Sequence, residues 1–305
     1  MTDLAQISPT VLTAAAAGPG TDGDTGRLLA RCPDRPGIVS AVTTFLSEAG
    51  ANIASLDQYS TAPSGGSFFQ RCVFHLPGLV ASLDELEKTF RERVADPLDM
   101  SFTLTRAAVP KRVGIMVSKL DHCLLDLLWR HRRGELPITV PVVIGNHPEL
   151  ADQVRPFGVP FVHVPVPKGG KPAAEERQLD LLRGNVDLVV LARYMQIISP
   201  EFLREVGAPM INIHHSFLPA FVGASPYARA KDRGVKLVGA TAHYVTEDLD
   251  EGPIIEQDVV RVGHTHTAAD LARLGADVER AVLSRAVRWH CEDRVMTDGN
   301  STIVL

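Results

Sequence analysis

The pattern of hydrophobic and polar positions divides the chain into two stretches in which strands and helices follow each other in different orders. From residue 27 to residue 105, short apolar runs of strand length alternate with two segments in which apolar residues recur every three or four positions. The order is strand, helix, strand, strand, helix and strand, which is typical of a ferredoxin-like α+β domain. The strands are expected at residues 27–30, 52–58, 68–76 and 100–105, and the helices at residues 38–49 and 83–94.

A second stretch begins after a short connection at residues 106–112 and occupies residues 113–305. Its strands are uninterrupted apolar runs, as expected for parallel strands that are buried on both faces. Helical segments separate these strands, so the pattern predicts a doubly wound, mostly parallel sheet. The expected strands are residues 113–117, 139–144, 161–164, 186–192, 238–245 and 254–262, and the helices are residues 124–131, 148–157, 173–183 and 267–293.

Composition narrows the class of protein. With 45% hydrophobic and 22% charged residues, the 305-residue chain has the composition of a globular protein with two domains. Its net charge of −5 gives no basis for nucleic-acid binding, and no stretch approaches the ~20 apolar residues of a membrane span. Residues 1–26 lack the basic start and apolar core of a signal peptide and are expected to form a disordered tail. The four cysteines show no Cys-x-x-Cys spacing, which favours free thiols in a cytoplasmic protein.

The segment at residues 211–219 carries the polar side chains that best indicate chemistry. Side chains alternate along a strand, so Asn212 and His214 are expected on one face and His215 on the other. An amide and an imidazole can stabilise the oxyanion of a tetrahedral intermediate, while Asp250, in a downstream turn, can accept and donate protons as a general base and acid. These residues predict acyl transfer from an amide. The alternative is a strand end with a structural, buried histidine.

The chain also contains the pattern of one known family, in Asn212-Ile213-His214, Leu218-Pro219, His243 and Asp250. With this pattern, residues 111–305 resemble the formyltransferase fold, a family that moves a formyl unit on or off 10-formyltetrahydrofolate. The resemblance implies that Asp250, His214 and Asn212 are the catalytic residues. It also implies that the folate is the substrate and that no separate cofactor takes part.

The same resemblance places the folate just past the carboxyl ends of the strands, where an open α/β sheet binds ligands. An apolar wall at residues 195–198 suits a flat pterin ring, and backbone groups of the 246–248 loop can meet its polar edge. For the apolar wall, ordinary core packing is the alternative. The substrate-binding residues that the resemblance implies are Arg193, Met195, Gln196, Ile197, Ile198, His243, Thr246, Glu247 and Asp248.

The acceptor of the formyl group depends on the turn after the first strand of this domain. Family members that act on glycinamide ribonucleotide have glycine amides there, which cradle the phosphate of the acceptor. Here residues 117–123 contain no glycine, and Asp121 would repel a second negative charge although Lys119 is nearby. Water is therefore the expected acceptor, and the resemblance implies hydrolysis to formate and tetrahydrofolate, which supplies formate for purine synthesis and balances folate pools. Transfer to an amine and a catalytically inactive sensor are the alternatives.

The sequence departs at one place from the hydrolytic members of this family. Ser225 and Ala228 stand where those members usually have a basic residue and a histidine, and Arg229 follows. The departure concerns substrate contacts and leaves the catalytic set unchanged.

No metal ion is expected. His214 and His215 point to opposite faces of a strand, so they cannot share one ion without distortion. His264 and His266 lie at a turn after Gly263 and are expected to be solvated.

The first domain resembles the ACT domain, a small-molecule-sensing and dimerising module, in the turn at residues 34–39 and in residues 50–53. Free backbone amides at the start of the following helix can take the carboxylate of an amino acid. A purely structural unit that helps the protein to oligomerise is the alternative. In either case a homo-oligomer, dimer or tetramer, is expected. The candidate ligand residues are Asp34, Arg35, Gly37 and Asn52.

Overall fold

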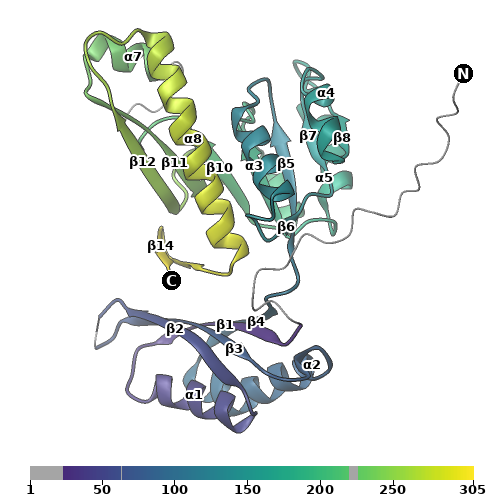
Figure 1. Ribbon diagram of the computed structural model, residues 1–305, viewed down its shortest axis with the longest axis vertical. Helices are drawn as coiled ribbons and strands as arrows, with labels where there is room; N and C mark the ends of the chain where they lie inside the picture. The colour runs from purple at the N-terminus through teal and green to yellow at the C-terminus, as the bar shows by residue number, and fades with distance from the viewer. Residues whose placement is uncertain (1–22, 63, 220–225) are drawn as a thin grey trace, which may run out of the picture.

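The structure is a computed structural model that describes residues 23–62, 64–219 and 226–305. Two domains follow each other along the chain, and the N-terminal domain lies at the bottom of Figure 1. Residues 1–22, which make up most of the expected tail, and Ser225 lie outside the described residues. In the described part of the chain, no helix is long and apolar enough to cross a membrane.

The N-terminal domain is a four-stranded antiparallel sheet with two helices on one face (Figure 1). Its strand order is β2-β3-β1-β4, so the expected ferredoxin-like arrangement is confirmed. The two helices and the facing side of the sheet share one core, in which Phe45, Phe74 and Phe90 are buried. The elements are β1 (Thr25–Pro33), α1 (Ile38–Glu48), β2 (Asn52–Ser60), β3 (Ser67–His75), α2 (Leu79–Phe90) and β4 (Ser101–Arg106).

Several boundaries in this domain differ from the expected ones. β1 begins at Thr25, so the last residues of the predicted tail belong to the sheet. α2 begins at Leu79 instead of residue 83, because Gly78 adopts a φ of 79° and turns the chain directly into the helix. After α2, Arg91–Ala95 forms a π-helical turn.

The second domain is built on an eight-stranded sheet of order β12-β11-β10-β9-β5-β7-β8, with β6 paired to β5. The strands from β10 to β8 in this order are parallel, whereas β11 and β12 are antiparallel to their neighbours. The expected doubly wound, mostly parallel sheet is confirmed. The strands are β5 (Lys111–Val117), β6 (Ile138–Thr139), β7 (Val143–Gly145), β8 (Phe161–His163), β9 (Leu188–Ala192), β10 (Met210–His214), β11 (Leu237–Tyr244) and β12 (Ile254–Arg261).

Helices cover both faces of this sheet. α3 (His122–Arg132) and α8 (Ala268–Cys291) pack on one face, and α5 (Lys171–Leu182) and α6 (Pro200–Glu205) pack on the other. The chain passes from β5 to β7 and β8 and then returns to β9 on the other side of β5. The direction of winding therefore switches between β5 and β9. Open α/β sheets bind their ligands past the carboxyl ends of the strands at such a switch.

The short elements of the second domain differ most from the predicted ones. The strand predicted at residues 139–144 divides into β6 and β7, because Pro141 has no N–H for the hydrogen bonds of a sheet. The helix predicted at residues 148–157 is reduced to α4 (Ala151–Val154) and a 3₁₀ turn, Arg155–Phe157. Two helices of six and eight residues and two strands of four residues show too little of a hydrophobic period to be predicted. Those that the pattern does not predict are α6, α7 (Pro226–Arg233), β13 (Val295–Asp298) and β14 (Ser301–Val304).

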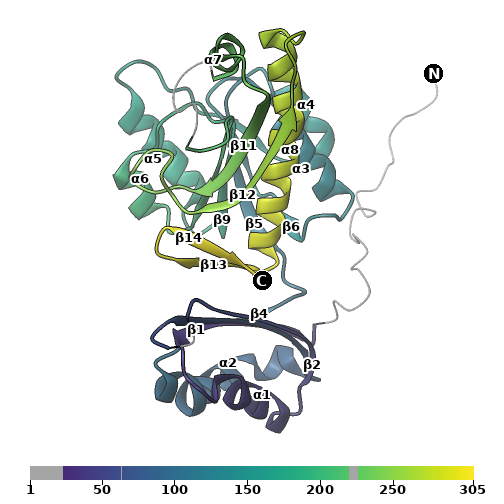
Figure 2. The ribbon, with the colours of Figure 1, turned by 90° about the vertical axis from the view of Figure 1, so that its left-hand side faces the viewer.

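The end of α8 joins the two domains. Asp293, just beyond the helix, accepts a hydrogen bond from Thr105 Oγ1 at 2.9 Å and pairs with Arg27 Nη1 at 3.3 Å and Lys111 Nζ at 3.1 Å. Arg71 donates to the carbonyl oxygens of Asp293 and of the residue before it, each at 2.9 Å. Because unpaired carbonyls make the C-terminal end of a helix negative, arginines of the N-terminal sheet bind it favourably. The β13–β14 hairpin lies between this sheet and the rest of the second domain (Figure 2).

We expect Asp293→Asn to weaken the junction between the domains. Asparagine tolerates the left-handed conformation of this residue, φ 54°, but has no charge for Arg27 and Lys111. The free energy of unfolding should fall by about 1.5–3 kcal/mol, the range for hydrogen bonds to charged groups, in urea titrations. Asp298→Asn is the matched control, because its pair with Arg31 is far more exposed. Equal losses in the two variants would show that Asp293 has no special role.

Candidate active site

A cavity of about 390 Å³ lies past the carboxyl ends of β9 and β10, beside the last residues of β11. The expected catalytic residues Asn212, His214 and Asp250 all line it. So do all but one of the expected substrate-binding residues. The other residues of its lining are Leu191, Tyr194, Ile213, His215, Val245 and Leu249.

Asp250 stands between two imidazoles. Its Oδ2 lies 3.2 Å from His214 Nδ1, and its Oδ1 lies 3.7 Å from His243 Nε2. His243 Nε2 is in turn 3.2 Å from Asn212 Nδ2, a contact set by the pairing of these two residues across β10 and β11. The structure therefore brings Asn212, His214 and Asp250 together. His243, which was expected to bind substrate, lies instead beside Asp250 and Asn212 and contacts both of them.

The turn at residues 246–253 carries Asp250 into this position. Asp250 has a φ of 59°, a left-handed conformation that aspartate adopts more readily than most residues. Gly252 packs against the end of β11, and a Cβ at this position would lie 1.8 Å from the carbonyl oxygen of Tyr244. Any other residue would push the turn, and Asp250 with it, away from the imidazoles.

The two imidazoles keep Asp250 ionised. Interactions with His214 and then His243 hold the pKa of Asp250 well below its usual range, although burial acts in the opposite direction. His214 turns Nδ1 to this carboxylate, and its Nε2 is buried without a hydrogen-bond partner among the described residues. An unpaired buried polar atom costs about 1–3 kcal/mol. His214 Nε2 is therefore the atom that a substrate group would satisfy.

Buried side chains fix the backbone as it leaves His214. The amide of Leu218 donates to Thr241 Oγ1 at 3.0 Å, and this hydroxyl donates to the carbonyl of Ser216 at 2.9 Å. Gln257 Nε2 donates to the carbonyl of Leu218 at 3.0 Å and to Thr241 Oγ1 at 2.9 Å. Strands β11 and β12 thus hold the segment that follows His214.

The prediction for His215 is wrong in one respect. β10 ends at His214, so the alternation that would turn His215 to the opposite face does not extend to it. His215 instead lines the cavity, with its ring centre 5.4 Å from that of His214 and 6.1 Å from that of Tyr227. Burial, and then the charge of Arg193, lowers the pKa of His215 to about 4, so this imidazole is neutral at pH 7.

The apolar wall has a buried part and an exposed rim. Tyr194 is buried, and its hydroxyl accepts a hydrogen bond from Gln178 at 2.8 Å. Met195 and Ile197 are 57% and 62% exposed, so they lie at the rim of the cavity and are not packed in the core. The amide of Met195 donates to Ser118 Oγ at 2.9 Å, which ties the wall to the end of β5. Exposed apolar side chains beside a cavity are typical of a ligand-binding site.

The loop on the opposite side is only partly as predicted. Thr246 and Glu247 line the cavity, but Asp248 is exposed and does not. The hydroxyl of Thr246 donates to the carbonyl of Asp248, which turns that residue outward. Leu249 takes its place in the lining, 59% exposed. A surface leucine between acidic residues is the signal in the sequence that indicates it.

The four candidate ligand residues of the ACT domain do not meet. Asp34 accepts a hydrogen bond from the hydroxyl of Ser60, the last residue of β2, and Arg35 Nη2 donates to the carbonyl of Pro97 at 2.9 Å. Asn52 is the first residue of β2. Nine residues of extended strand separate the ends of β2 by roughly 26 Å, so Asn52 lies far from the turn and the expectation that it shares one ligand site with the other three residues is wrong. Gly37 caps α1 with a φ of 95°.

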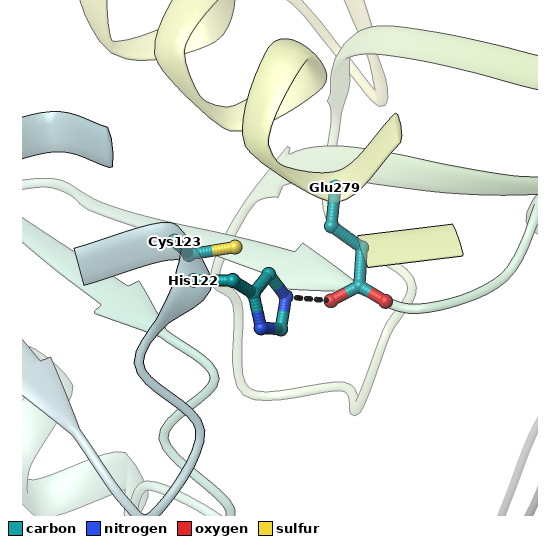
Figure 3. A group of neighbouring side chains, drawn as sticks. All are labelled: His122, Cys123 and Glu279. Atoms are coloured by element: carbon teal, nitrogen blue, oxygen red, sulfur yellow. Dashed lines mark hydrogen bonds and ion pairs between the residues drawn. The ribbon is translucent and has the colours of Figure 1, made fainter. Parts of the chain in front are cut away.

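One group in the described part of the chain has ligand atoms close enough to share a metal ion, namely His122, Cys123 and Glu279. Figure 3 shows the imidazole of His122 bonded to the Glu279 carboxylate, with the Cys123 thiol beside them. Arg193 Nε lies 3.5 Å from the same carboxylate oxygen, and a cation placed there would be repelled. Burial also raises the pKa of Cys123 well above its usual value, which disfavours the thiolate that a metal needs. These observations favour a hydrogen-bonded cluster over a metal site.

The chain matches two families of known proteins. A family described as formyl transferase matches residues 111–287, and the ACT domain family matches residues 26–91. A formyltetrahydrofolate deformylase of Mycobacterium bovis is 69% identical over 281 residues, which are 92% of this chain and 91% of that protein. The chain belongs to the formyltetrahydrofolate deformylase family. Another deformylase, of Bacillus subtilis, is 52% identical over 92% of this chain and 94% of that protein.

The fold of the deformylases extends over both domains. The crystal structure of a formyltetrahydrofolate deformylase from Pseudomonas syringae matches this chain with a TM-score of 0.88 and 46% identity, over 92% of this chain and 94% of that one. Of the two positions at which this sequence departs from the pattern of deformylases, Ser225 lies outside the described residues. Ala228 is exposed on α7 and does not line the cavity.

We expect His215 to make stability depend on acidic pH. Its pKa is about 4 in the folded protein and roughly 6.5 when unfolded, so the unfolded chain binds a proton first as the pH falls. Stability should therefore fall between about pH 6.5 and pH 4, by at most about 1.4 kcal/mol per pH unit for this residue. His215→Gln should flatten the pH dependence in urea titrations, while His290, whose pKa burial also lowers to about 4, contributes equally to both proteins. Parallel curves for the two proteins would refute the assignment.

Proposed function

We propose that this protein hydrolyses 10-formyltetrahydrofolate to formate and tetrahydrofolate. The observation that carries the proposal is the ionised Asp250, placed between His214 and His243 and beside Asn212 at a cavity with an apolar wall. The relatives of this chain that are named formyltetrahydrofolate deformylase support the same reaction. The site residues supply donors and a proton acceptor themselves, so the proposal involves no cofactor.

The geometry supports a division of roles among three residues. Asp250 orients a water molecule toward the formyl carbon and takes its proton as the new C–O bond forms. Asn212 Nδ2 donates a hydrogen bond to the oxyanion that develops on the formyl oxygen, and the imidazolium form of His214, with its Nδ1–H on Asp250, donates a second one from Nε2. The C–N10 bond then breaks, N10 receives the proton, and formate leaves. Because the pKa of Asp250 is held low, its carboxyl group does not stay protonated and passes the proton on to N10.

The folate is proposed to lie between the wall at Tyr194–Ile198 and the loop at Val245–Leu249. The exposed apolar side chains of Met195, Ile197 and Leu249 would cover a flat ring on binding. Polar contacts would come from Gln196 and the backbone of the loop. We also place this reaction in the cytoplasm, where four unpaired, buried cysteines are ordinary, and propose that its formate feeds purine synthesis.

The decisive assay measures formate and tetrahydrofolate released from 10-formyltetrahydrofolate by the purified protein, without and with glycinamide ribonucleotide. Hydrolysis predicts equal rates in both and no formylated ribonucleotide. A formylated ribonucleotide made as fast as formate would instead favour a transferase. Failure to release formate at all would favour the third possibility, an inactive sensor.

We expect Asp250→Asn to lower the turnover number by at least ~100-fold, the scale of general acid–base catalysis. The substitution keeps size and hydrogen bonding but removes the proton acceptor, so folate binding should be largely retained. His214→Ala should lose about 3 kcal/mol of transition-state stabilisation as one oxyanion donor. Glu251→Gln, in an exposed neighbour that does not line the cavity, is the matched control and should turn over normally. Turnover of Asp250→Asn within a few-fold of wild type would rule out this mechanism.

We also propose that the ACT domain binds an amino acid and pairs with a second copy of the chain. The turn at Asp34 and Gly37, where the amides of α1 begin, is the place we assign to the ligand's carboxylate. For the pairing, β2 lies at the edge of its sheet and is exposed along its length, with Tyr59 50% exposed. The edge of a sheet is a template for pairing with another chain.

Residues 106–305 alone are expected to lose the oligomeric state of the full chain while keeping some hydrolysis. The sheet edge that we assign to pairing is absent from this fragment, whereas the whole cavity is present. Light scattering gives the particle mass of both proteins directly. A fragment with as many subunits per particle as the full chain would contradict this role of the ACT domain.

A further inference from the structure

Arg193 is a buried cation with hydrogen-bond donors that the described part of the chain leaves unused. It is the first residue after β9, lines the catalytic cavity and is 8% exposed. Its Nε and Nη1 have no hydrogen-bond partner among the residues that the structure describes. Buried charged groups are normally both paired and hydrogen-bonded, because water no longer solvates them. An arginine with two unused donors at a cavity therefore indicates a ligand that carries acceptor atoms.

Glu279 balances the charge of Arg193 without satisfying its donors. The carboxylate oxygen that lies 3.5 Å from Arg193 Nε accepts a hydrogen bond from His122 Nε2 at 2.8 Å, and the other oxygen accepts one from the Tyr227 hydroxyl at 2.7 Å. The backbone of Arg193 has a φ of 60°, a left-handed conformation that is unfavourable for an arginine. Residues held in such a conformation cluster at functional sites.

Arg193 lies at the end of the cavity where the reaction takes place. Besides burial, four neighbouring groups shift the pKa of His215, namely Arg193, Glu279, His214 and Asp250. The ring centre of His215 is 5.4 Å from that of His214, and both line the same cavity as Arg193 and Asp250. The donors of Arg193 are therefore grouped with the residues that we assign to the formyl carbon and are not part of the exposed apolar wall.

Hydrolysis makes a charged product that formyl transfer to an amine does not make. Attack by water and cleavage of the C–N10 bond give formic acid, which, like other carboxylic acids, is ionised to its anion and a proton at pH 7. Transfer to an amine would give a neutral amide. Formate forms beside Asp250, whose carboxylate is itself ionised, and two like charges in a partly buried cavity repel each other. The product anion therefore needs a cation close by.

We propose that Arg193 binds the product formate and holds its carboxylate as the C–N10 bond breaks. A guanidinium presents a planar fork of N–H donors that matches the two oxygens of a carboxylate. The inference rests on the proposed hydrolysis and deepens it, because only water as the acceptor makes an anion at this place. The carboxylates of the folate are the other source of such an anion, and the test below separates the two.

The test compares melting temperatures in sodium formate and in sodium chloride, at equal ionic strength and pH 7. Formate should raise the melting temperature of wild type saturably, by about 2–4 °C at ten times the dissociation constant. Arg193→Gly should lose this response, and glycine suits the φ of 60° at this position. Arg204→Ala is the matched control and should respond as wild type does, because Arg204 is exposed, is paired with Glu201 and Glu247, and does not line the cavity.

No saturable response of wild type to formate, or an equal response of Arg193→Gly, overturns the proposal. Tetrahydrofolate is the second ligand, and it should stabilise wild type and Arg193→Gly alike. Loss of its effect in Arg193→Gly would assign Arg193 to a carboxylate of the folate and overturn the proposal. If Arg193→Gly does not fold, Arg193→Lys keeps the charge without the planar fork and should bind formate about 10-fold more weakly. Equal affinity of Arg193→Lys and wild type would then overturn it.

No part of this test requires turnover, so its outcome is independent of the proposed hydrolysis. A protein that hydrolyses 10-formyltetrahydrofolate without binding formate would refute the role of Arg193 and leave the hydrolase assignment in place. A protein that binds formate through Arg193 but releases none from the folate would refute the hydrolase assignment and leave the formate site in place.

Discussion

The pairing of β11 with β10 is the constraint on which the candidate site depends. Its antiparallel register sets His243 opposite Asn212 and Thr241 opposite His214. A slip of one residue would turn His243 to the other face of the sheet and remove the partner of both Asn212 and Asp250. The turn that carries Asp250 starts at the end of β11, so the same register decides where the carboxylate returns. Gly252, packed against the Tyr244 carbonyl, then fixes the path of that turn.

The register also explains how much of the site the sequence predicts. Asn212, His214 and Asp250 belong to a motif that spacing and resemblance reveal, and the structure brings them together. The role of His243 depends on a cross-strand contact that no spacing along the chain expresses. His215 was assigned to the opposite face of the strand by the alternation of side chains, but this alternation ends with β10 at His214. Sequence patterns therefore identified which residues gather, and failed where a strand end or a register decides the contact.

In the fold, too, a repeated sequence pattern predicted an element, whereas features set by a short segment or a single contact were missed. Long periodic segments such as α1 and α8, and buried strands such as β9, were predicted because many residues repeat one constraint. The short α6, α7 and β13–β14 carry no such repeat. In the ACT domain, a whole strand separates the Asp34 turn from Asn52, a distance that motif similarity does not record. Glu279 did leave a signal: it interrupts, with Gly275, the buried stripe of α8 formed by Leu271, Val282 and Ala286.

α8 gives one physical account of why the two domains occur in a single chain. A capping box of Thr267 and Asp270 fixes its start, Glu279 contacts Arg193 near its middle, and Asp293 just past its end is held by the N-terminal sheet. A second contact reaches the site from the same end of the helix, since His290 Nδ1 lies 2.7 Å from the hydroxyl of Tyr244, which neighbours His243. Contacts along this one helix thus connect the ACT sheet to Arg193 and to Tyr244, the neighbour of His243.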